Sequence, residues 1–348
     1  MIRVKITNRD IGDGEPCFII AEAGVNHNGD IRLAKKLIDV AKDAGADAVK
    51  FQTFKAEGVV TASTNSTDYA KKNIGRNISQ MQMMKSLELN YDDFEKLKKY
   101  CDKKEIIFLS TPHSFDAIDF LENLIPAYKF GSGDITNIPA LKHAASKGKP
   151  IILGTGMSTL DEVKHAINAI KSEGNEQIVV LHCTTNYPCP FKEVNLRAMI
   201  TMQKELDCLV GYSDHTLGIL VPIVATALGA TVIEKHFTID KSLPGPDHKA
   251  SLEPDELKNM ITEIKKTEKV LGRLDKKPTE SEKEIMKFVR KSIIAKKDIE
   301  KGSVINEDKI IIKRPGTGLK PSDLDKIIGK KANRHILKDE VFQLNMVE

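Results

Sequence analysis

Residues 17–51 read CFIIAEAGVNHNGDIRLAKKLIDVAKDAGADAVKF, and this stretch decides the fold. Two short apolar runs, 17–24 and 46–51, enclose a longer segment in which apolar residues recur three and four positions apart, as at Leu33 and Leu37. Gly45 marks the end of that segment. A buried strand, a helix and a second buried strand, in this order, indicate a parallel β–α–β unit.

Further apolar runs repeat the strand pattern along the chain. They lie at 106–111, 127–132, 150–155, 177–183, 208–213 and 231–237, which gives eight expected strands with the first two. Amphipathic segments separate most of them, and eight such units within about 250 residues predict an α/β fold, the closed (β/α)8 or TIM barrel. Residues 52–92 form an unusually long connection, which is typical of a lid, a binding loop or an insertion.

The chain changes in character after Gly272. Residues 273–284 are polar and contain a proline, which indicates a linker. The rest consists of short segments between Gly, Pro and Asp turns, which predicts a small, mostly β domain. We therefore expect a catalytic barrel over 1–272, a linker over 273–284 and a small domain over 285–348.

The composition argues against several classes of protein. The net charge of +4, from 53 basic and 49 acidic residues, is too small to indicate nucleic-acid binding, and the Lys-rich segment 261–297 alternates in sign like a solvated helix face. No apolar run approaches the roughly 18 residues of a membrane span, and the chain starts without an apolar leader. We expect a cytoplasmic protein with no membrane or nucleic-acid partner. The five scattered cysteines argue against disulfides or structural zinc.

Two lysines stand in otherwise apolar expected strands, at Lys50 and Lys129. In a (β/α)8 barrel the active site forms at the carboxyl ends of the strands. An ammonium group is costly to bury there unless it meets an anion. With the Gly-rich turns at 131–133 and 154–156, the two lysines predict a pocket for a doubly negative phosphate group. The alternative is that each lysine pairs with a neighbouring carboxylate or extends to solvent.

Two histidines lie at the ends of adjacent expected strands. His215 follows the seventh strand and His236 ends the eighth. Two imidazole nitrogens, with water and substrate oxygen in the other positions, suit an exchangeable catalytic metal ion. Each histidine alone is also a common structural residue. Cys183, at another strand end, is either a third ligand or a small buried thiol.

A series of motifs resembles that of one enzyme family. The motifs are, in order, IAEAGVNHNG, VKFQTF, STPHS, YKFGSGD, GTGMS, HCTTNYPCP, GYSDHT, EKHFT, GPDHKAS and RPGTG. They are similar to those of the N-acetylneuraminate (sialic acid) synthases and their legionaminic and pseudaminic acid relatives, and the match covers nearly the whole chain. Residues 285–348 resemble the antifreeze-like (SAF) domain that these enzymes carry.

The resemblance implies a reaction and a set of residues for it. It implies condensation of phosphoenolpyruvate with an N-acetylated amino sugar, N-acetylmannosamine or a 2,4-diacetamido sugar, to a nine-carbon 2-keto acid and phosphate. It implies a divalent ion at His215 and His236, typically Mn²⁺, with Mg²⁺ or Co²⁺ as alternatives, and Glu22 as a further catalytic residue. Phosphoenolpyruvate is expected at Lys50, Thr111, Lys129, Ser132 and Ser213, and the Gly-rich turn at 154–156 adds Thr155 to this set. The sugar is expected at Gln52, Asp134, Tyr187, Asp247 and Arg314. Such families exchange the small domain between two chains, which implies a domain-swapped homodimer in which Arg314 serves the partner.

Some residues depart from the family pattern. Gly154 stands where relatives often have Ser, and Asp134 stands where Glu is expected. Thr185 and Asn186 match no single sugar specificity. Gly154 removes one hydroxyl from the expected phosphate pocket, and Asp134 shortens an expected contact with the sugar. These departures leave the reaction class unchanged and leave the choice of sugar open. Two alternatives stay open, a synthase that acts on a phosphorylated aldose and a carbohydrate-binding protein without enzymatic activity.

Overall fold

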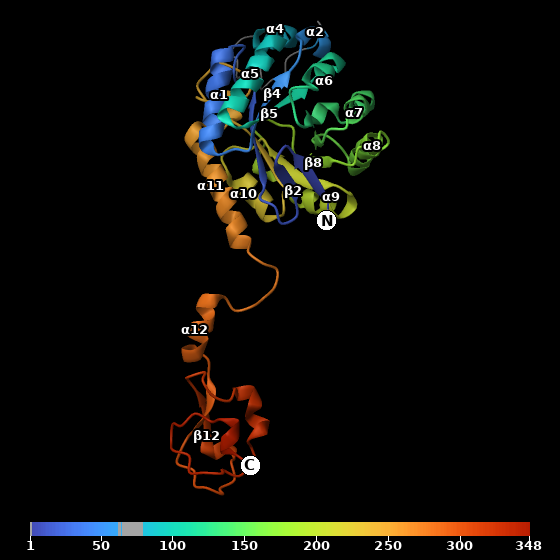
Figure 1. The fold of residues 1–348 in the computed structure, drawn as a ribbon. Coiled ribbons are helices and arrows are strands. Elements are labelled where there is room, and N and C mark those ends of the chain that lie inside the picture. The colour runs from blue at the N-terminus through green and yellow to red at the C-terminus, as the bar shows by residue number, and fades with distance from the viewer. Residues whose placement is uncertain (1, 62–63, 65–78) are drawn as a thin grey trace. The chain divides into compact units, whose positions relative to one another are not determined.

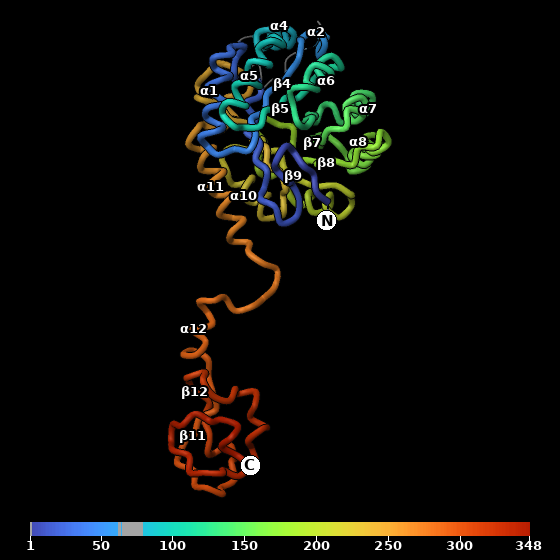
Figure 2. Tube along the Cα trace, in the orientation of Figure 1, coloured from blue at the N-terminus to red at the C-terminus, as the bar shows by residue number. Residues whose placement is uncertain are grey.

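The computed structural model describes residues 2–61, 64 and 79–348 of the chain. These residues form two compact units, Met1–Gly272 and Arg273–Glu348. Figure 1 labels many of the elements of both units, and Figure 2 traces the same path as a tube.

Eight parallel strands form the frame of the first unit. They are β3 (Phe18–Gly24), β4 (Ala48–Thr53), β5 (Ile107–Pro112), β6 (Tyr128–Phe130), β7 (Ile151–Gly154), β8 (Ile178–His182), β9 (Leu209–Asp214) and β10 (Val232–His236). The sheet order β5-β4-β3-β10-β9-β8-β7-β6 pairs the first of these strands with the last. The sheet therefore curls into a nearly closed barrel, and the predicted (β/α)8 fold is confirmed. Each expected strand coincides with an observed one.

Helices surround the barrel (Figure 1). They are α1 (Ile31–Ala44), α5 (Tyr91–Lys104), α6 (Phe115–Leu121), α7 (Ile138–Ala145), α8 (Leu160–Lys171), α9 (Arg197–Glu205), α10 (Leu220–Ala227) and α11 (Pro254–Leu271). Local sequence sets their ends. In α1, the Asp30 side chain caps the start by accepting from the Arg32 N–H, and Gly45 ends the helix at φ 86°. None of the helices among the described residues is long and apolar enough to cross a membrane.

In its described residues, the long connection after β4 contains the short helices α2 (Ala56–Val59) and α4 (Gln80–Leu87). Ser79 caps α4 in a reciprocal arrangement with Gln82. Met83 and Leu87 of α4 pack with Val25 and Phe54 near the carboxyl ends of β3 and β4. The expectation of a lid, a binding loop or an insertion over residues 52–92 includes residues 62–63 and 65–78, which lie outside the described residues.

A hairpin that the sequence did not predict precedes the barrel. Strands β1 (Arg3–Ile6) and β2 (Arg9–Gly12) pair antiparallel. Their apolar side chains belong to the same cluster as the inward-pointing residues near the amino ends of the barrel strands. The hairpin therefore covers the amino-terminal end of the barrel, so that the opposite end is left as the mouth.

The inward face of the barrel changes from apolar to polar towards the carboxyl ends of the strands. Successive side chains of a strand point to opposite faces, so residues two apart share a face. Ile20 belongs to the inner apolar cluster, and Glu22 follows it on the same face. On β10, Val232 belongs to that cluster, and Glu234 and His236 follow it. The alternation of side chains along the strands therefore places polar groups at the mouth of the barrel.

The second unit has its own core. It contains helix α12 (Glu280–Val289) and an antiparallel pair of strands, β11 (Ser292–Ala295) and β12 (Ile310–Lys313). Isolated bridges and 3-10 turns at Glu307–Lys309, Pro321–Lys326 and Leu344–Met346 complete it. Thr279 caps α12 together with Glu282, and the helix runs across the boundary expected between 284 and 285. The expected linker is therefore helical in its last residues.

Candidate active site

A cavity of about 220 Å³ lies at the carboxyl ends of the barrel strands. It is lined by Glu22, Lys50, Gln52, Thr111, His113, Lys129, Gly131, Ser132, Gly133, Gly154, Cys183, Thr185, Tyr187, Ser213, His215, Glu234 and His236. Most of the residues predicted for the site are among them. A larger hollow of about 470 Å³ near Ile107 and Pro126 lies at the amino ends of the strands, away from the end where barrel enzymes place their chemistry.

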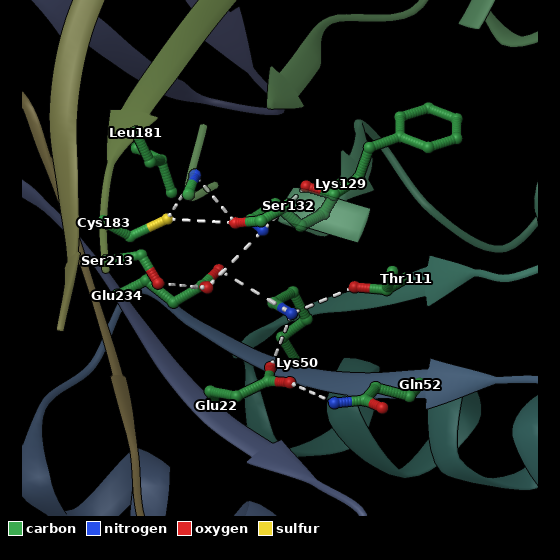
Figure 3. A network of polar contacts seen from close by, with 12 residues as sticks. Glu22, Lys50, Gln52, Thr111, Lys129, Ser132, Leu181, Cys183, Ser213 and Glu234 are labelled. Carbon is green, nitrogen blue, oxygen red and sulfur yellow. Dashed lines mark hydrogen bonds and ion pairs between the residues drawn. The ribbon is translucent and has the colours of Figure 1, made fainter. Parts of the chain in front are cut away.

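Two ammonium groups meet carboxylates inside this cavity (Figure 3). The Nζ atom of Lys50 lies 2.8 Å from Oε2 of Glu22 and 3.7 Å from Oε2 of Glu234. The Nζ atom of Lys129 lies 3.5 Å from Oε1 of Glu234. Glu234 therefore links the two lysines. The lysines come together at one place, as the sequence predicts, and each also has the carboxylate partner that the alternative interpretation proposed.

Hydrogen bonds hold this charged cluster in place. Lys50 donates to Oγ1 of Thr111 at 3.0 Å. Ser213 donates to Oε1 of Glu234 at 2.9 Å, and Gln52 donates to Oε1 of Glu22 at 3.2 Å. Buried polar groups with several partners have few alternative rotamers, so the arrangement is preorganised for binding.

Burial and pairing separate the ionisation of the two carboxyl groups. Burial raises the pKa of Glu22 to about 7, with Lys50 opposing the shift and Glu234 adding to it. Burial acts in the same direction on Glu234, but the ammonium groups of Lys129 and Lys50 outweigh it and lower the pKa of Glu234 to about 2. Glu22 is therefore the carboxylate that takes up a proton near neutral pH. Its protonation leaves the cluster with a net positive charge that favours an anion.

Small residues line the wall near Lys129. The Gly156 N–H donates to Oγ of Ser132 at 3.0 Å and to Sγ of Cys183 at 3.1 Å. A Cβ atom at Gly156 would collide with Oγ1 of Thr185, so only glycine fits. Burial raises the pKa of the Cys183 thiol, and its partners are Ser132 and Gly156. These contacts favour the buried-thiol interpretation over the third metal ligand.

Gly154, which stands where relatives often have Ser, leaves space in the same wall of the cavity. A Cβ atom there would lie 3.2 Å from both N and Oγ of Ser132. The absence of a side chain at Gly154 therefore leaves the Ser132 hydroxyl accessible from this side.

The two imidazoles lie side by side at the mouth. The ring centroids of His215 and His236 are 5.6 Å apart, and the Tyr187 ring is 4.2 Å from His215 and 5.6 Å from His236. Nδ1 of His215 is 2.8 Å from the Thr184 carbonyl oxygen. A carbonyl oxygen only accepts, so Nδ1 carries the hydrogen and Nε2 keeps its lone pair. Burial lowers the pKa of both histidines, which favours the neutral form that binds metals.

The donors present fit a metal ion that keeps open coordination positions. Nδ1 of His236 is buried without a hydrogen-bond partner among the described residues, and its nearest acidic atom is Oδ2 of Asp247 at 4.0 Å. No group of three or more His, Cys, Asp or Glu residues in the described part of the chain is arranged to hold an ion. The protein thus offers two imidazoles, and water and substrate would complete the coordination.

Several predicted site residues lie outside the cavity. Thr155 follows Gly154, which lines the cavity, so its side chain points to the other face, where its hydroxyl donates to the Leu181 carbonyl at 2.9 Å. The expected contact of Thr155 with phosphoenolpyruvate is therefore not supported. Asp134 lies near the cavity, with Oδ2 3.8 Å from Nδ1 of His113. Arg314 belongs to the second unit, where it is exposed and its Nε donates to the Val289 carbonyl at 3.1 Å.

The sequence interpretation assigned no role to Glu234, His113 or Thr185, which also line the cavity. A usable signal existed for the first two. Glu234 lies two residues before His236, and His113 two residues after Thr111, so strand alternation places each pair on one face. Thr185 belongs to the loop after β8, and no periodic pattern predicts where a loop residue points.

These features define a class of protein, a (β/α)8 enzyme whose mouth holds buried lysines beside a pair of neutral imidazoles. The profile of the NeuB family matches residues 37–276, and that of the SAF domain matches residues 290–348. The chain belongs to the NeuB family and carries a SAF domain.

Individual relatives agree with this assignment. The N,N'-diacetyllegionaminic acid synthase of Legionella pneumophila is 48% identical over 330 residues, which cover 93% of each chain. The N-acetylneuraminate-9-phosphate synthase of Homo sapiens is 35% identical over 344 residues, or 98% of this chain and 95% of the human one. The crystal structure of the N-acetylneuraminic acid (sialic acid) synthetase of Leptospira borgpetersenii with citrate superposes with a TM-score of 0.73 at 35% identity, and covers 82% of this chain and 95% of that one. The resemblance seen in the motifs is confirmed.

Proposed function

We propose that this enzyme condenses phosphoenolpyruvate with the open-chain form of an unphosphorylated 2,4-diacetamido sugar, giving a nine-carbon 2-keto acid and phosphate. The observation that carries the proposal is the convergence of Lys50 and Lys129 on Glu234, inside a cavity that also contains the His215 and His236 rings. The similarity to a diacetyllegionaminic acid synthase at 48% identity supports the choice of sugar.

The lysines supply the site for phosphoenolpyruvate. Lys50 and Lys129 are almost fully buried, with side chains 4% exposed. Fixed ammonium groups in a site that excludes water stabilise a phosphate more strongly than they would in solvent. The hydroxyls of Thr111, Ser132 and Ser213 line the same cavity and are available to donate to phosphate or carboxylate oxygens.

The imidazoles would hold a divalent ion, Mn²⁺ in our proposal. When bound, such an ion polarises a carbonyl oxygen as a Lewis acid. Tyr187 contacts both histidine rings and Gln52 contacts Glu22, so these two side chains are placed to orient the sugar beside them. Asp247, buried near His236, is proposed to bind a sugar hydroxyl.

The bond changes balance with one water. C3 of phosphoenolpyruvate forms a bond to the aldehyde carbon, and the aldehyde oxygen gains a proton. Water adds at C2, the C2–O bond to phosphate breaks, and C2 becomes the keto carbon. The two protons of the water end on the new hydroxyl and on phosphate. Glu22, whose pKa is raised to about 7 by burial, is proposed to accept and return the proton of that water.

The charge distribution of the cavity favours a sugar without a phosphate group. Among the described residues that line the cavity, the ammonium groups are those of Lys50 and Lys129, and both face Glu234. One phosphate is matched by this pair, and a second would need further cations. Asp134, one methylene shorter than the expected Glu, lies near this cavity and leaves more room for a bulky substituent.

We include a homodimer in the proposal, in which the small domain of one chain brings Arg314 to the cavity of the other. Arg314 is exposed on a loop rich in Gly and Pro, and a guanidinium group suits hydroxyl-rich or carboxylate ligands. Light scattering of the purified chain should give the mass of a dimer. A monomer with full activity would exclude this part of the proposal.

The test of the reaction is product analysis. The purified chain is incubated with phosphoenolpyruvate and Mn²⁺, and with N-acetylmannosamine, its 6-phosphate, a 2,4-diacetamido-2,4,6-trideoxy hexose or a phosphorylated aldose. Mass spectrometry should find the nine-carbon 2-keto acid chiefly with the free diacetamido sugar. A product from a phosphorylated substrate alone would favour the alternative synthase. No phosphate release with any sugar would favour a carbohydrate-binding protein.

A further inference from the structure

A buried ion pair lies directly behind the two imidazoles. Asp214 and Lys235 are cross-strand neighbours at the ends of β9 and β10, and both side chains are 0% exposed. Nζ of Lys235 lies 2.5 Å from Oδ2 of Asp214 and also donates to the Thr216 carbonyl oxygen. Asp214 in turn accepts from the N–H and Oγ1 of Thr216, at 3.2 Å and 3.0 Å.

This network is connected to both histidines through the backbone. His215 stands between Asp214 and Thr216, and His236 follows Lys235. Side chains alternate along a strand, so Asp214 and Lys235 point away from the cavity while the residues next to them point into it. The network therefore ties the chain on both sides of His215 to the residue that precedes His236.

A second set of contacts fixes His215 from the side of β8. Its Nδ1 binds the Thr184 carbonyl at 2.8 Å, and its own carbonyl accepts from the Cys189 N–H, also at 2.8 Å. These contacts orient the ring but do not involve β10. Two side-chain contacts join the ends of β9 and β10, the Ser213–Glu234 hydrogen bond and the Asp214–Lys235 ion pair. Only the ion pair is formed by the residues that directly precede His215 and His236.

Stability alone does not require charges at this place. A fully buried ion pair has a large desolvation penalty, and apolar side chains of similar volume are often equally or more stabilising. What the ion pair adds over an apolar pair is a fixed distance and direction between two backbones. That property is what a metal site with two ligands on different strands needs.

We infer that Asp214, Lys235 and Thr216 are positioning residues that set the spacing of His215 and His236, and thereby the affinity of this histidine pair for a divalent ion. The inference rests on the proposed metal-dependent function. It assigns no contact with substrate to these three residues.

The test measures Mn²⁺ binding rather than turnover. The double variant Asp214→Asn with Lys235→Met removes both charges and keeps the side-chain volumes. Free Mn²⁺ is quantified by electron paramagnetic resonance during titration of the full chain, and the thermal unfolding midpoint is recorded in parallel. We expect the folded double variant to bind Mn²⁺ about tenfold or more weakly, the usual effect of removing outer-shell partners. Unchanged affinity in the folded double variant overturns the inference.

A second variant covers the case in which the double variant does not fold. Thr216→Val keeps the shape of the side chain and removes one hydrogen bond to Asp214, so Mn²⁺ affinity should fall about fivefold, which corresponds to the net worth of one hydrogen bond. Unchanged affinity in this variant also overturns the inference.

A matched control separates positioning from general destabilisation. Asp47 accepts from the Ile19 N–H at 2.8 Å near the opposite end of the strands, and Asp47→Asn weakens a polar contact without touching the histidines. This variant should keep the Mn²⁺ affinity of the unsubstituted chain, and an equal loss would overturn the inference. If the unsubstituted chain binds no Mn²⁺, the proposed metal dependence fails. If it binds Mn²⁺ through His215 and His236 and the double variant matches it, the positioning role alone fails.

Discussion

The ammonium nitrogen of Lys129 lies 3.5 Å from Oε1 of Glu234, inside the mouth of the barrel. The same carboxylate also faces Lys50, so one side chain neutralises part of the charge that the reaction is proposed to use. A phosphate that binds here must compete with Glu234 for the two ammonium groups. The lysines are consequently held in place before any substrate arrives.

Replacing Lys129 with Met should lower kcat/KM for phosphoenolpyruvate about 10²- to 10³-fold, because one of two charges that stabilise phosphate is lost from a site that excludes water. Steady-state phosphate release measures the effect. Lys164→Met is the control, since Lys164 forms a surface ion pair with Glu205 at 3.0 Å and should leave the rate unchanged. A Lys129→Met enzyme with the parental kcat/KM would contradict the role of this lysine.

Glu234→Gln should destabilise the fold by about 3 kcal/mol, because two buried ammonium groups lose their shared carboxylate. Urea unfolding in buffers with and without inorganic phosphate provides the measurement. Phosphate should raise the unfolding midpoint more in this variant than in the parent, since the anion replaces the missing charge. Equal phosphate effects on both proteins would argue against an anion site at the two lysines.

The pH dependence of stability should differ between the parent and Glu22→Gln. Burial raises the pKa of Glu22 to about 7 from an ordinary value near 4.5, so the folded state holds this proton more tightly than the unfolded state. Its contribution is fully present below pH ~4.5 and is lost as the pH rises through about 7. The parent should therefore lose stability relative to Glu22→Gln between about pH 5 and pH 8. A constant difference over that window would show that the carboxyl group titrates normally.

His236→Ala should abolish Mn²⁺-dependent turnover and leave the fold intact, because one of the two proposed ligands is removed. Activity with and without a chelator, together with circular dichroism, measures both parts. His165→Ala on the exposed face of α8 is the control and should behave like the parent. Normal activity of the His236→Ala enzyme after chelation would contradict the proposed role of a metal ion in the reaction.

The barrel could be predicted because apolar residues recur with different periods in its strands and in its helices. Every expected strand was observed, and helix ends such as Asp30 and Gly45 carry local signals. The hairpin at residues 3–12 was missed because its short strands have no long apolar run. The helix over Glu280–Val289 was missed because its polar composition is also that of a linker, although Thr279 and Glu282 form a recognisable cap.

The site could be predicted in part for a similar reason. Lysines and histidines at strand ends stand out against apolar sequence, and strand alternation places them at the mouth. No role is predicted for Glu234, because it lies on β10 and Lys50 lies on β4, and β3 separates these two strands in the sheet. Their contact depends on the curvature of the barrel, which brings the carboxyl ends of separate strands to one mouth. The Gly-rich turn at 154–156 predicts that Thr155 faces the cavity, whereas alternation after Gly154 places its side chain on the other face.

The most direct measurement is a crystal structure of the chain soaked with phosphoenolpyruvate and Mn²⁺. The account predicts the phosphate within hydrogen-bond distance of both Lys50 and Lys129, and Mn²⁺ bound by nitrogen atoms of both His215 and His236. Phosphoenolpyruvate bound away from these lysines, or imidazoles that do not share one ion, would contradict it.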